Sequence, residues 1–321
     1  MNGTQSSNCP SNPTAKKIGI TFAYCLIFIV ALAGNTVIGI IVYKKKTMRK
    51  PINFFIVNTA MSDLLFPIFL IPWKIQTLYI YSWLISGPLG QILCELVDFL
   101  AEVSSVVSIQ SLVLIAVDRF GAVVYPLRSP LIRSKKCPFF ILATWIVAIA
   151  VNSPVFIARE LVVYPEKVVC ERNWNKVFGE FSSYETYIMS YIVVFTFTPF
   201  GLLAILYITI YLKLKSQKIP GEQSANAGKQ RQQRERNVLK LAIAIVSGFA
   251  VCWLPLTIFW CIFHFTVSKL FLDTIIWPNC EVPFYVFFVD FMALANCAGK
   301  NPCICLIFSR NYRNELKALF R

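Results

Sequence analysis

Long apolar runs constrain the fold of this chain more than any other feature of its sequence. A helix needs about 20 residues to cross the hydrocarbon of a bilayer, and seven runs are long enough: 18–43, 53–78, 93–124, 138–158, 186–213, 238–264 and 282–308. The composition agrees, since 57% of the residues are hydrophobic and only 15% are charged. We therefore predict an all-α membrane protein in which residues 18–308 form a seven-transmembrane helix bundle.

The basic residues predict how this bundle is oriented. With residues 1–17 as an extracellular N-terminal tail, 22 of the 31 Lys and Arg residues fall on the cytoplasmic side, as the positive-inside rule expects. The basic clusters 44–46 and 229–236 adjoin apolar runs, where they suit anionic headgroups. The net charge of +15 therefore indicates contact with membrane lipid and no nucleic acid, in a multi-pass protein of the plasma membrane.

Two segments outside the apolar runs also carry local patterns. The stretch "LVVYPEKVVC", residues 161–170, has a β-prone run on each side of Pro165, which predicts a β-hairpin. Residues 309–321 separate apolar from basic side chains at helical spacing, which predicts a short cytoplasmic amphipathic helix lying on the inner leaflet. The apolar face of that helix would consist of Tyr312, Leu316, Leu319 and Phe320.

Short motifs occur in the runs in a fixed order. They are Gly34-Asn35, Asp63 closing "NTAMSD", "DRF" at 118–120, Trp145 with Pro154, Pro199 with Tyr207, "CWLP" at 252–255 and Asn301-Pro302. Together they make the chain resemble a rhodopsin-type (class A) G-protein-coupled receptor of the neuropeptide-receptor branch, over essentially its whole length. The resemblance implies a receptor that is no enzyme and needs no cofactor. An extracellular ligand would move the sixth span outward and promote nucleotide exchange on a heterotrimeric G protein.

The resemblance also implies a switch at the cytoplasmic ends of the spans. Arg119 would pair with Asp118 and with Glu235 until activation, although an arginine at a span end can also simply reach toward the headgroups. Pro255 would kink the sixth span, because it removes a helical hydrogen bond. The remaining switch positions implied by the family are Tyr207, Trp253, Ile109, Pro199, Phe249, Asn301 and Pro302.

Cysteines and one asparagine suggest modifications on the outer side. The family implies a disulfide between Cys94 and Cys170. Cys9 and Cys280 are the two other cysteines expected outside, and they could form a second bridge or stay unpaired. Asn2 begins an Asn-Gly-Thr sequon, which could be glycosylated.

Lys300 is unusual because a charge inside a span is costly. Opsins bind retinal through a seventh-span lysine, but their position corresponds to Ala295 here, and five residues turn Lys300 about 140° away from it. A retinal-binding light receptor is therefore disfavoured. Two alternatives stay open: Lys300 pairs with Asp63 inside the bundle, or its side chain extends to the inner headgroups.

Asp63, beside Ser108, occupies the family's sodium-binding position. Two neighbouring positions that are usually polar are Cys297 and Ala298, so we expect no metal there. Cys305 replaces the tyrosine of the family's Asn-Pro-x-x-Tyr motif, which removes a hydroxyl associated with the active state.

The outer half of the chain indicates the class of ligand. Ala101 replaces the aspartate that holds the ammonium of small amines, which disfavours an amine ligand. Eleven outer carboxylates face eight outer Lys and Arg residues, so a cationic peptide with aromatic side chains is expected. The expected pocket residues are Trp73, Asp98, Ala101, Glu102, Tyr191, Trp260, Phe287 and Phe291. A non-peptide ligand is the alternative, and the aromatic residues could instead be membrane-interface anchors.

Overall fold

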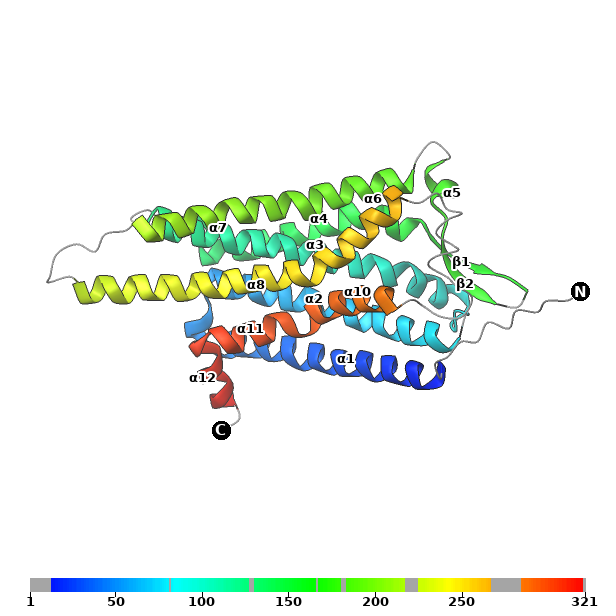
Figure 1. Ribbon diagram of the computed structural model, residues 1–321, viewed down its shortest axis with the longest axis horizontal. Coiled ribbons are helices and arrows are strands. Elements are labelled where there is room, and N and C mark those ends of the chain that lie inside the picture. Colours follow the sequence, from blue (N-terminus) through cyan, green and yellow to red (C-terminus); the bar gives the residue numbers. More distant parts are fainter. Residues whose placement is uncertain are drawn as a thin grey trace, which may run out of the picture.

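The computed structural model describes residues 13–80, 82–126, 130–165, 167–179, 183–216, 225–266 and 284–319. Six helical segments among them are long and apolar enough to cross a membrane. They are α1 (Pro13–Lys44), α2 (Pro51–Tyr79), α3 (Gly87–Val124), α4 (Cys137–Ile157), the fifth span made of α6 (Tyr184–Ile192), η3 (Val193–Phe197) and α7 (Thr198–Ser216), and α8 (Ala225–Thr266). Figure 1 shows these helices side by side in one bundle.

The seventh apolar segment is helical in three consecutive pieces. They are α10 (Phe284–Ala295), the π-helical η4 (Asn296–Lys300) and α11 (Asn301–Phe308). The seven predicted runs therefore all lie in helices, apart from their outermost residues, and the multi-pass helical fold is confirmed. The first twelve residues of the predicted N-terminal tail lie outside the described part of the chain.

Helix α3 is the central element of the bundle. In its most apolar window 61% of the residues are buried, against 22% in that of α4. Large apolar side chains instead point outward from the peripheral helices, for example Phe22, Phe139 and Ile205. That arrangement suits a lipid environment, in which backbone polar groups must be paired within helices while apolar side chains can face outward.

Proline residues explain the main irregularities of the helices. Proline lacks a backbone N–H and cannot donate to the preceding turn, and both π-helical stretches end just before one, η3 before Pro199 and η4 before Pro302. Pro255 lies inside α8, and α8 bends in its outer part toward α6 (Figure 1). Single turns of π-helix occur often at functional sites.

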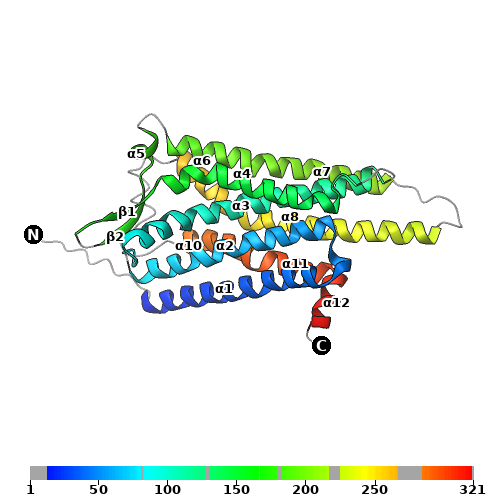
Figure 2. The same cartoon turned by 180° about the vertical axis from the view of Figure 1, so that it is seen from behind.

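A two-stranded antiparallel hairpin covers one end of the bundle, as the sequence predicted. Strand β1 (Arg159–Val163) pairs with β2 (Val168–Arg172), and Leu161 lies opposite Cys170. The short helix α5 (Trp174–Phe178) follows β2. We call this end of the bundle the hairpin end, and Figure 2 shows from behind that α12 lies at the opposite end.

Helix α12 (Arg310–Leu319) is the predicted amphipathic helix. It runs across the bundle axis (Figure 1). Tyr312 is buried and its hydroxyl donates to Asn53 Oδ1 at 3.3 Å. Glu315 pairs with Lys45 at 3.0 Å. Both contacts tie α12 to the ends of α1 and α2, which fixes its direction.

Candidate functional site

A cavity of about 180 Å³ lies between α3, α6, η3 and α8, and β2 contributes one residue to its wall. The residues from α3 include Asp98, Glu102, Ser105 and Ile109. These positions recur every three or four residues, so they share one face of the helix. The cavity therefore has a polar wall on α3.

Aromatic rings form a stripe along the fifth span. Tyr184, Tyr187, Tyr191 and Phe195 follow at helical spacing, and successive ring centroids are 6.2, 6.3 and 5.7 Å apart. Trp174 of α5 extends the stripe, with its ring 5.3 Å from that of Tyr184 and 5.0 Å from that of Tyr187. Because Tyr184, Tyr191 and Phe195 line the cavity, its second wall is aromatic.

Glu102 is the acid that faces this aromatic wall. The Tyr191 hydroxyl donates to its Oε2 at 2.8 Å. Among the residues that the structure describes, Glu102 makes no ion pair within 4.0 Å. Arg172 also attracts this carboxylate, but the hydrogen bond that it accepts comes from a neutral donor, so it can still accept charge-assisted hydrogen bonds from a cation.

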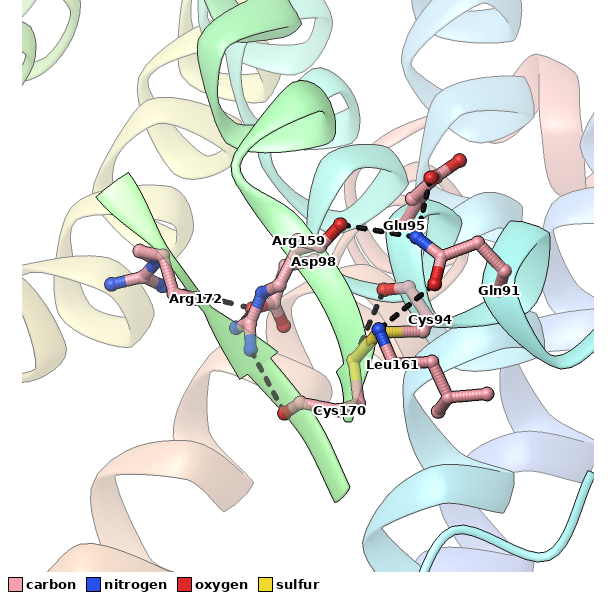
Figure 3. The surroundings of a disulfide bond; sticks show 8 residues. All are labelled: Gln91, Cys94, Glu95, Asp98, Arg159, Leu161, Cys170 and Arg172. Atoms are coloured by element: carbon pink, nitrogen blue, oxygen red, sulfur yellow. Dashed lines mark hydrogen bonds and ion pairs between the residues drawn. A yellow bond between two sulfur atoms is a disulfide. The ribbon is translucent and has the colours of Figure 1, made fainter. Parts of the chain in front are cut away.

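Asp98, one turn away on α3, is held by two arginines of the hairpin (Figure 3). Arg159 forms an ion pair with Asp98 Oδ2, and Arg172 lies 3.7 Å from the same oxygen. Arg159 and Arg172 are directly opposite each other in the hairpin, so Asp98 offsets the repulsion between them. Burial, and the neighbouring Arg172, lower the pKa of Arg159 to about 10, which leaves it charged at neutral pH.

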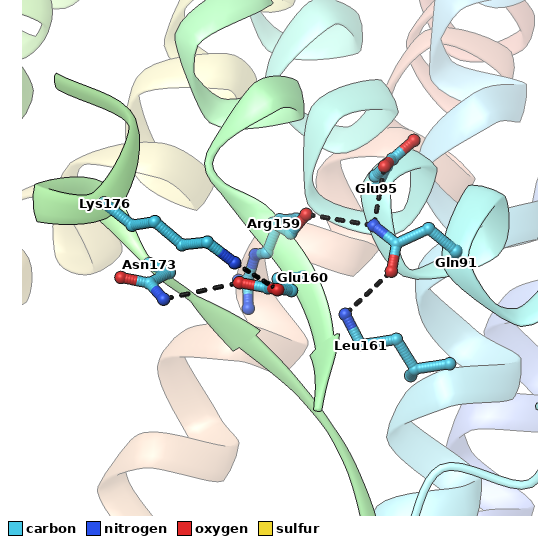
Figure 4. Close-up of polar contacts among 7 residues, drawn as sticks. All are labelled: Gln91, Glu95, Arg159, Glu160, Leu161, Asn173 and Lys176. Atoms are coloured by element: carbon cyan, nitrogen blue, oxygen red, sulfur yellow. Dashed lines mark hydrogen bonds and ion pairs between the residues drawn. The ribbon is translucent and has the colours of Figure 1, made fainter. Parts of the chain in front are cut away.

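The hairpin is also joined to α3 by a covalent bond and by an amide. Cys94 and Cys170 form the expected disulfide, with their Cα atoms 5.6 Å apart. Gln91 Oε1 accepts from the Leu161 N–H at 2.8 Å, and its Nε2 donates to the Arg159 carbonyl at 3.2 Å (Figure 4). Gln91 thus satisfies the free edge of β1 as a neighbouring strand would.

A second pair of like charges, Glu160 and Glu171, also faces across the hairpin. Lys176 donates to Glu160 at 2.5 Å and Asn173 donates to it at 3.3 Å (Figure 4). The bond from Lys176 is the main reason that the pKa of Glu160 is lowered. The Tyr164 hydroxyl donates to Glu171 at 3.0 Å, and this bond raises the pKa of Tyr164. Each glutamate therefore has its own donor.

Trp253 of α8 forms the floor of the cavity together with Phe249. Its ring stacks on that of Phe249 at 6.0 Å and meets that of Phe66 edge-on at 5.9 Å. The indole Nε1 is buried without a hydrogen-bond partner among the described residues. The Thr257 hydroxyl donates to the Trp253 carbonyl at 3.0 Å, beside Pro255.

A buried polar network lies deeper in the bundle. Asp63 accepts from the Ser108 hydroxyl at 2.7 Å and from Asn301 Nδ2 at 2.7 Å. Ser62 and Ser108 are hydrogen-bonded at 3.0 Å. The network joins α2 and α3 to the start of α11, and a buried carboxylate needs such partners. The side chain of Lys300 lies outside the described residues, so its pairing with Asp63 stays a prediction.

Arg119 lies near the end of α3, away from the hairpin. Its Nε donates to Asp118 Oδ2 at 3.1 Å. Tyr207 of α7 is buried, and its hydroxyl has no hydrogen-bond partner among the described residues. The side chain of Glu235, the other expected partner of Arg119, lies outside the described residues.

The sequence matches a family of known receptors. The family model described as "7 transmembrane receptor (rhodopsin family)" matches residues 34–304. The chain belongs to the rhodopsin family of seven-transmembrane receptors. The resemblance inferred from the ordered motifs is therefore confirmed, and the receptor has the seven-helix bundle of that family.

Curated relatives of this receptor carry neuropeptide-receptor names. A QRFP-like peptide receptor of Branchiostoma floridae is 29% identical over 97% of this chain and 79% of that protein. A RYamide receptor of Drosophila melanogaster is 28% identical over 93% of this chain and 62% of that protein. The human neuropeptide Y receptor type 2 is 30% identical over 95% of this chain and 77% of that protein.

The receptor's cavity brings together only some of the expected pocket residues. Asp98, Glu102 and Tyr191 line it. Ala101 lies on another face of α3 and is buried in an apolar cluster with residues of α1, α2 and α10, and Trp73, Phe287 and Phe291 pack against that cluster. The side chain of Trp260, the second pair Cys9 and Cys280, and the sequon at Asn2 lie outside the described residues.

Arg172 is the basic residue among the cavity-wall residues that were not predicted from the sequence. It lies two residues after Cys170, so the disulfide expected from the family could have placed it near the third span. The aromatic stripe also had a signal, because Tyr184, Tyr187, Tyr191 and Phe195 repeat at helical spacing.

Proposed function

We propose that this receptor is activated by an extracellular peptide that carries a basic side chain and aromatic side chains, and that it signals through a heterotrimeric G protein. The observation that carries the proposal is Glu102, an acid that forms no ion pair with any described residue and lies in a cavity with an aromatic wall. A lysine or arginine side chain satisfies such a carboxylate, and tyrosine rings favour cations at their faces. The names of the relatives agree with a peptide ligand.

The proposal places the hairpin end outside the cell and α12 in the cytoplasm. The Cys94–Cys170 disulfide supports this orientation, because disulfides persist in oxidising compartments. The basic clusters at 44–46 and 229–236 belong to the opposite side, as expected for cytoplasmic segments.

Fewer outer acids are available to bind a cationic ligand than the count from the sequence suggested. Asp98 is held by Arg159 and Arg172, Asp290 accepts from Lys74 at 2.6 Å, and Glu160 is paired with Lys176. Paired acids attract a cation weakly, because the attraction is offset by the partner. Specificity for a cation therefore rests on Glu102.

Activation would follow from repacking at the cavity floor. A ligand side chain beside Trp253 can favour a rearrangement of Phe249 and of the bend at Pro255, which would swing the far half of α8 outward. Arg119 would then exchange Asp118 for the Tyr207 hydroxyl, and the exchange is supported by the lack of a hydrogen-bond partner for that buried hydroxyl within the described part of the chain. The ligand shifts this equilibrium only as far as its affinities for the two states differ.

The test is G-protein dissociation in cells that express the receptor, screened against peptides with basic and aromatic residues, with one arm given retinal and light. We expect one peptide class to activate it. Glu102→Gln should then weaken potency about tenfold or more, as expected for the loss of a hydrogen-bonded ion pair. Asp290→Asn is the matched control and should change potency far less, because Asp290 is not part of the cavity wall.

Three results would contradict the proposal. A response to light alone would indicate an opsin. Silence toward every peptide at a surface-expressed receptor would favour a non-peptide ligand. Unchanged peptide potency at the Glu102→Gln receptor would show that another group binds the cationic side chain.

A further inference from the structure

Arg172 has guanidinium N–H groups that donate no hydrogen bond within the part of the chain that the structure describes. Its guanidinium lines the cavity and lies 4.0 Å from the ring centroid of Tyr184. Asp98 Oδ2 lies 3.7 Å from it, within ion-pair distance but beyond hydrogen-bond distance, and the Arg172 side chain is 30% exposed. Its side chain donates no hydrogen bond to any described residue. A planar fork of donors, oriented by an aromatic ring, is therefore available in the cavity.

Asp98 does not compensate this group fully. Arg159 already forms the close ion pair with Asp98, and it is the less exposed of the two arginines, at 13%. Asp98 is thus shared by two guanidinium groups, and Glu102, the other acid of the cavity, attracts Arg172 without forming an ion pair with it within 4.0 Å. An anion in the cavity would complete the coordination of Arg172.

A carboxylate suits this position better than a phosphate. Arginine binds a carboxylate through two parallel hydrogen bonds in one plane. Asp98 and Glu102 line the same cavity and would repel a dianion more strongly than a group with a single negative charge.

Glu102 lies one helical turn from Asp98, the carboxylate that Arg172 approaches, so the opposite charges of Glu102 and Arg172 lie near each other in the cavity. Four residues of α3 span about 6 Å along its axis. The stem of a lysine or arginine has four or more bonds of about 1.5 Å each and bridges this distance. The cavity volume of about 180 Å³ is below the roughly 300–1,000 Å³ of sites for whole drug-sized ligands. One residue of a peptide therefore fits the cavity, while the rest lies outside it.

We infer that the cavity binds the C-terminal residue of the peptide, a lysine or arginine with a free carboxylate. Its side chain pairs with Glu102, and its carboxylate pairs with Arg172. The aromatic side chains that precede it lie toward Trp174 and the stripe on the fifth span. This inference rests on the proposed peptide-receptor function and specifies which end of the peptide binds in the cavity.

The test uses three probes on the purified full-length receptor in lipid nanodiscs: N-acetyl-Phe-Arg as the free acid, the same dipeptide as its C-terminal amide, and N-acetyl-Phe-citrulline as the free acid. Binding is measured from the shift of the thermal unfolding midpoint with probe concentration. We expect the acid to bind about tenfold or more tightly than the amide, since a charged hydrogen-bonded pair is lost with the amide. The citrulline probe, which lacks the cation, should also bind more weakly.

Variants separate the two contacts. Arg172→Gln should bind acid and amide equally, and Arg172→Lys should keep part of the preference and show that the position tolerates substitution. Glu102→Gln should lose the preference for arginine over citrulline but keep the preference for the acid. Lys176→Gln, a basic residue of the same loop that pairs with Glu160, is the control and should behave like the unmodified receptor.

Equal binding of acid and amide to the unmodified receptor would overturn the inference, and so would a preference that persists in Arg172→Gln. If amidated peptides activate the G protein while this preference is absent, the proposed function stands and only the inference fails. If no probe binds and no peptide activates the receptor, both fail.

Discussion

Asp98 is one carboxylate between two guanidinium groups, and the three side chains come from α3, β1 and β2. Removing its charge leaves both arginines facing each other across the hairpin without their shared counter-ion. Breaking a buried ion pair by removing one partner costs more than the pair contributes, because the remaining charge is left unsolvated. The hairpin end therefore depends on this residue more than on any exposed ion pair nearby.

We predict that Asp98→Asn destabilises the receptor by about 2 kcal/mol, below the 3–5 kcal/mol typical of fully buried pairs because Asp98 is partly exposed. The thermal unfolding midpoint of the purified protein is the measurement. Glu160→Gln, which breaks the exposed pair with Lys176 in the same hairpin, should leave the midpoint unchanged. Equal midpoints for the two variants would show that the arginines do not need Asp98.

At the scale of helices and strands, the contact between α1 and the seventh span depends on one glycine. A Cβ at Gly34 would come within 2.5 Å of the Pro302 ring, while a Cβ at Gly39 of the same helix would meet nothing within 4 Å. Beside this contact, Asn35 Nδ2 donates to the Cys297 carbonyl at 2.9 Å, in the π-helical η4. The close approach of Gly34 to Pro302 and the hydrogen bond from Asn35 to Cys297 together fix where α1 meets η4 and α11.

Gly34→Ala should therefore separate α1 from the seventh span and lower the thermal midpoint, since the opposing group is a rigid ring that cannot rotate away. Gly39→Ala should be neutral or stabilising by up to about 1 kcal/mol, as expected from helix propensity. The comparison is made in one detergent on both variants. A Gly34→Ala receptor as stable as Gly39→Ala would mean that the two helices move apart at no cost.

At the scale of the whole molecule, the sequence predicted what depends on local pattern. Hydropathy located the spans because each must be apolar over a bilayer's thickness, and the β-prone runs around Pro165 located the hairpin. Ion pairing was not predictable, because Asp98 meets Arg159 and Arg172 only after the disulfide and Gln91 position the hairpin on α3. Similarly, the face of α3 that turns Ala101 away from the cavity is decided by packing against α2 and α10.

The pairing of three of the outer acids with neighbouring bases has a kinetic consequence. Long-range attraction accelerates the encounter of charged partners only where a surface carries a large net potential, and such acceleration falls steeply with ionic strength. With Asp98, Glu160 and Asp290 each offset by a neighbouring base, we expect the association rate of a cationic peptide to change less than about tenfold between low and physiological ionic strength. Stopped-flow or surface-based binding at several salt concentrations measures it, and a steep decline would mean that unpaired acids steer the peptide. A weak salt dependence would mean that the selectivity of this receptor resides in how long a peptide stays bound, with little contribution from how fast it arrives.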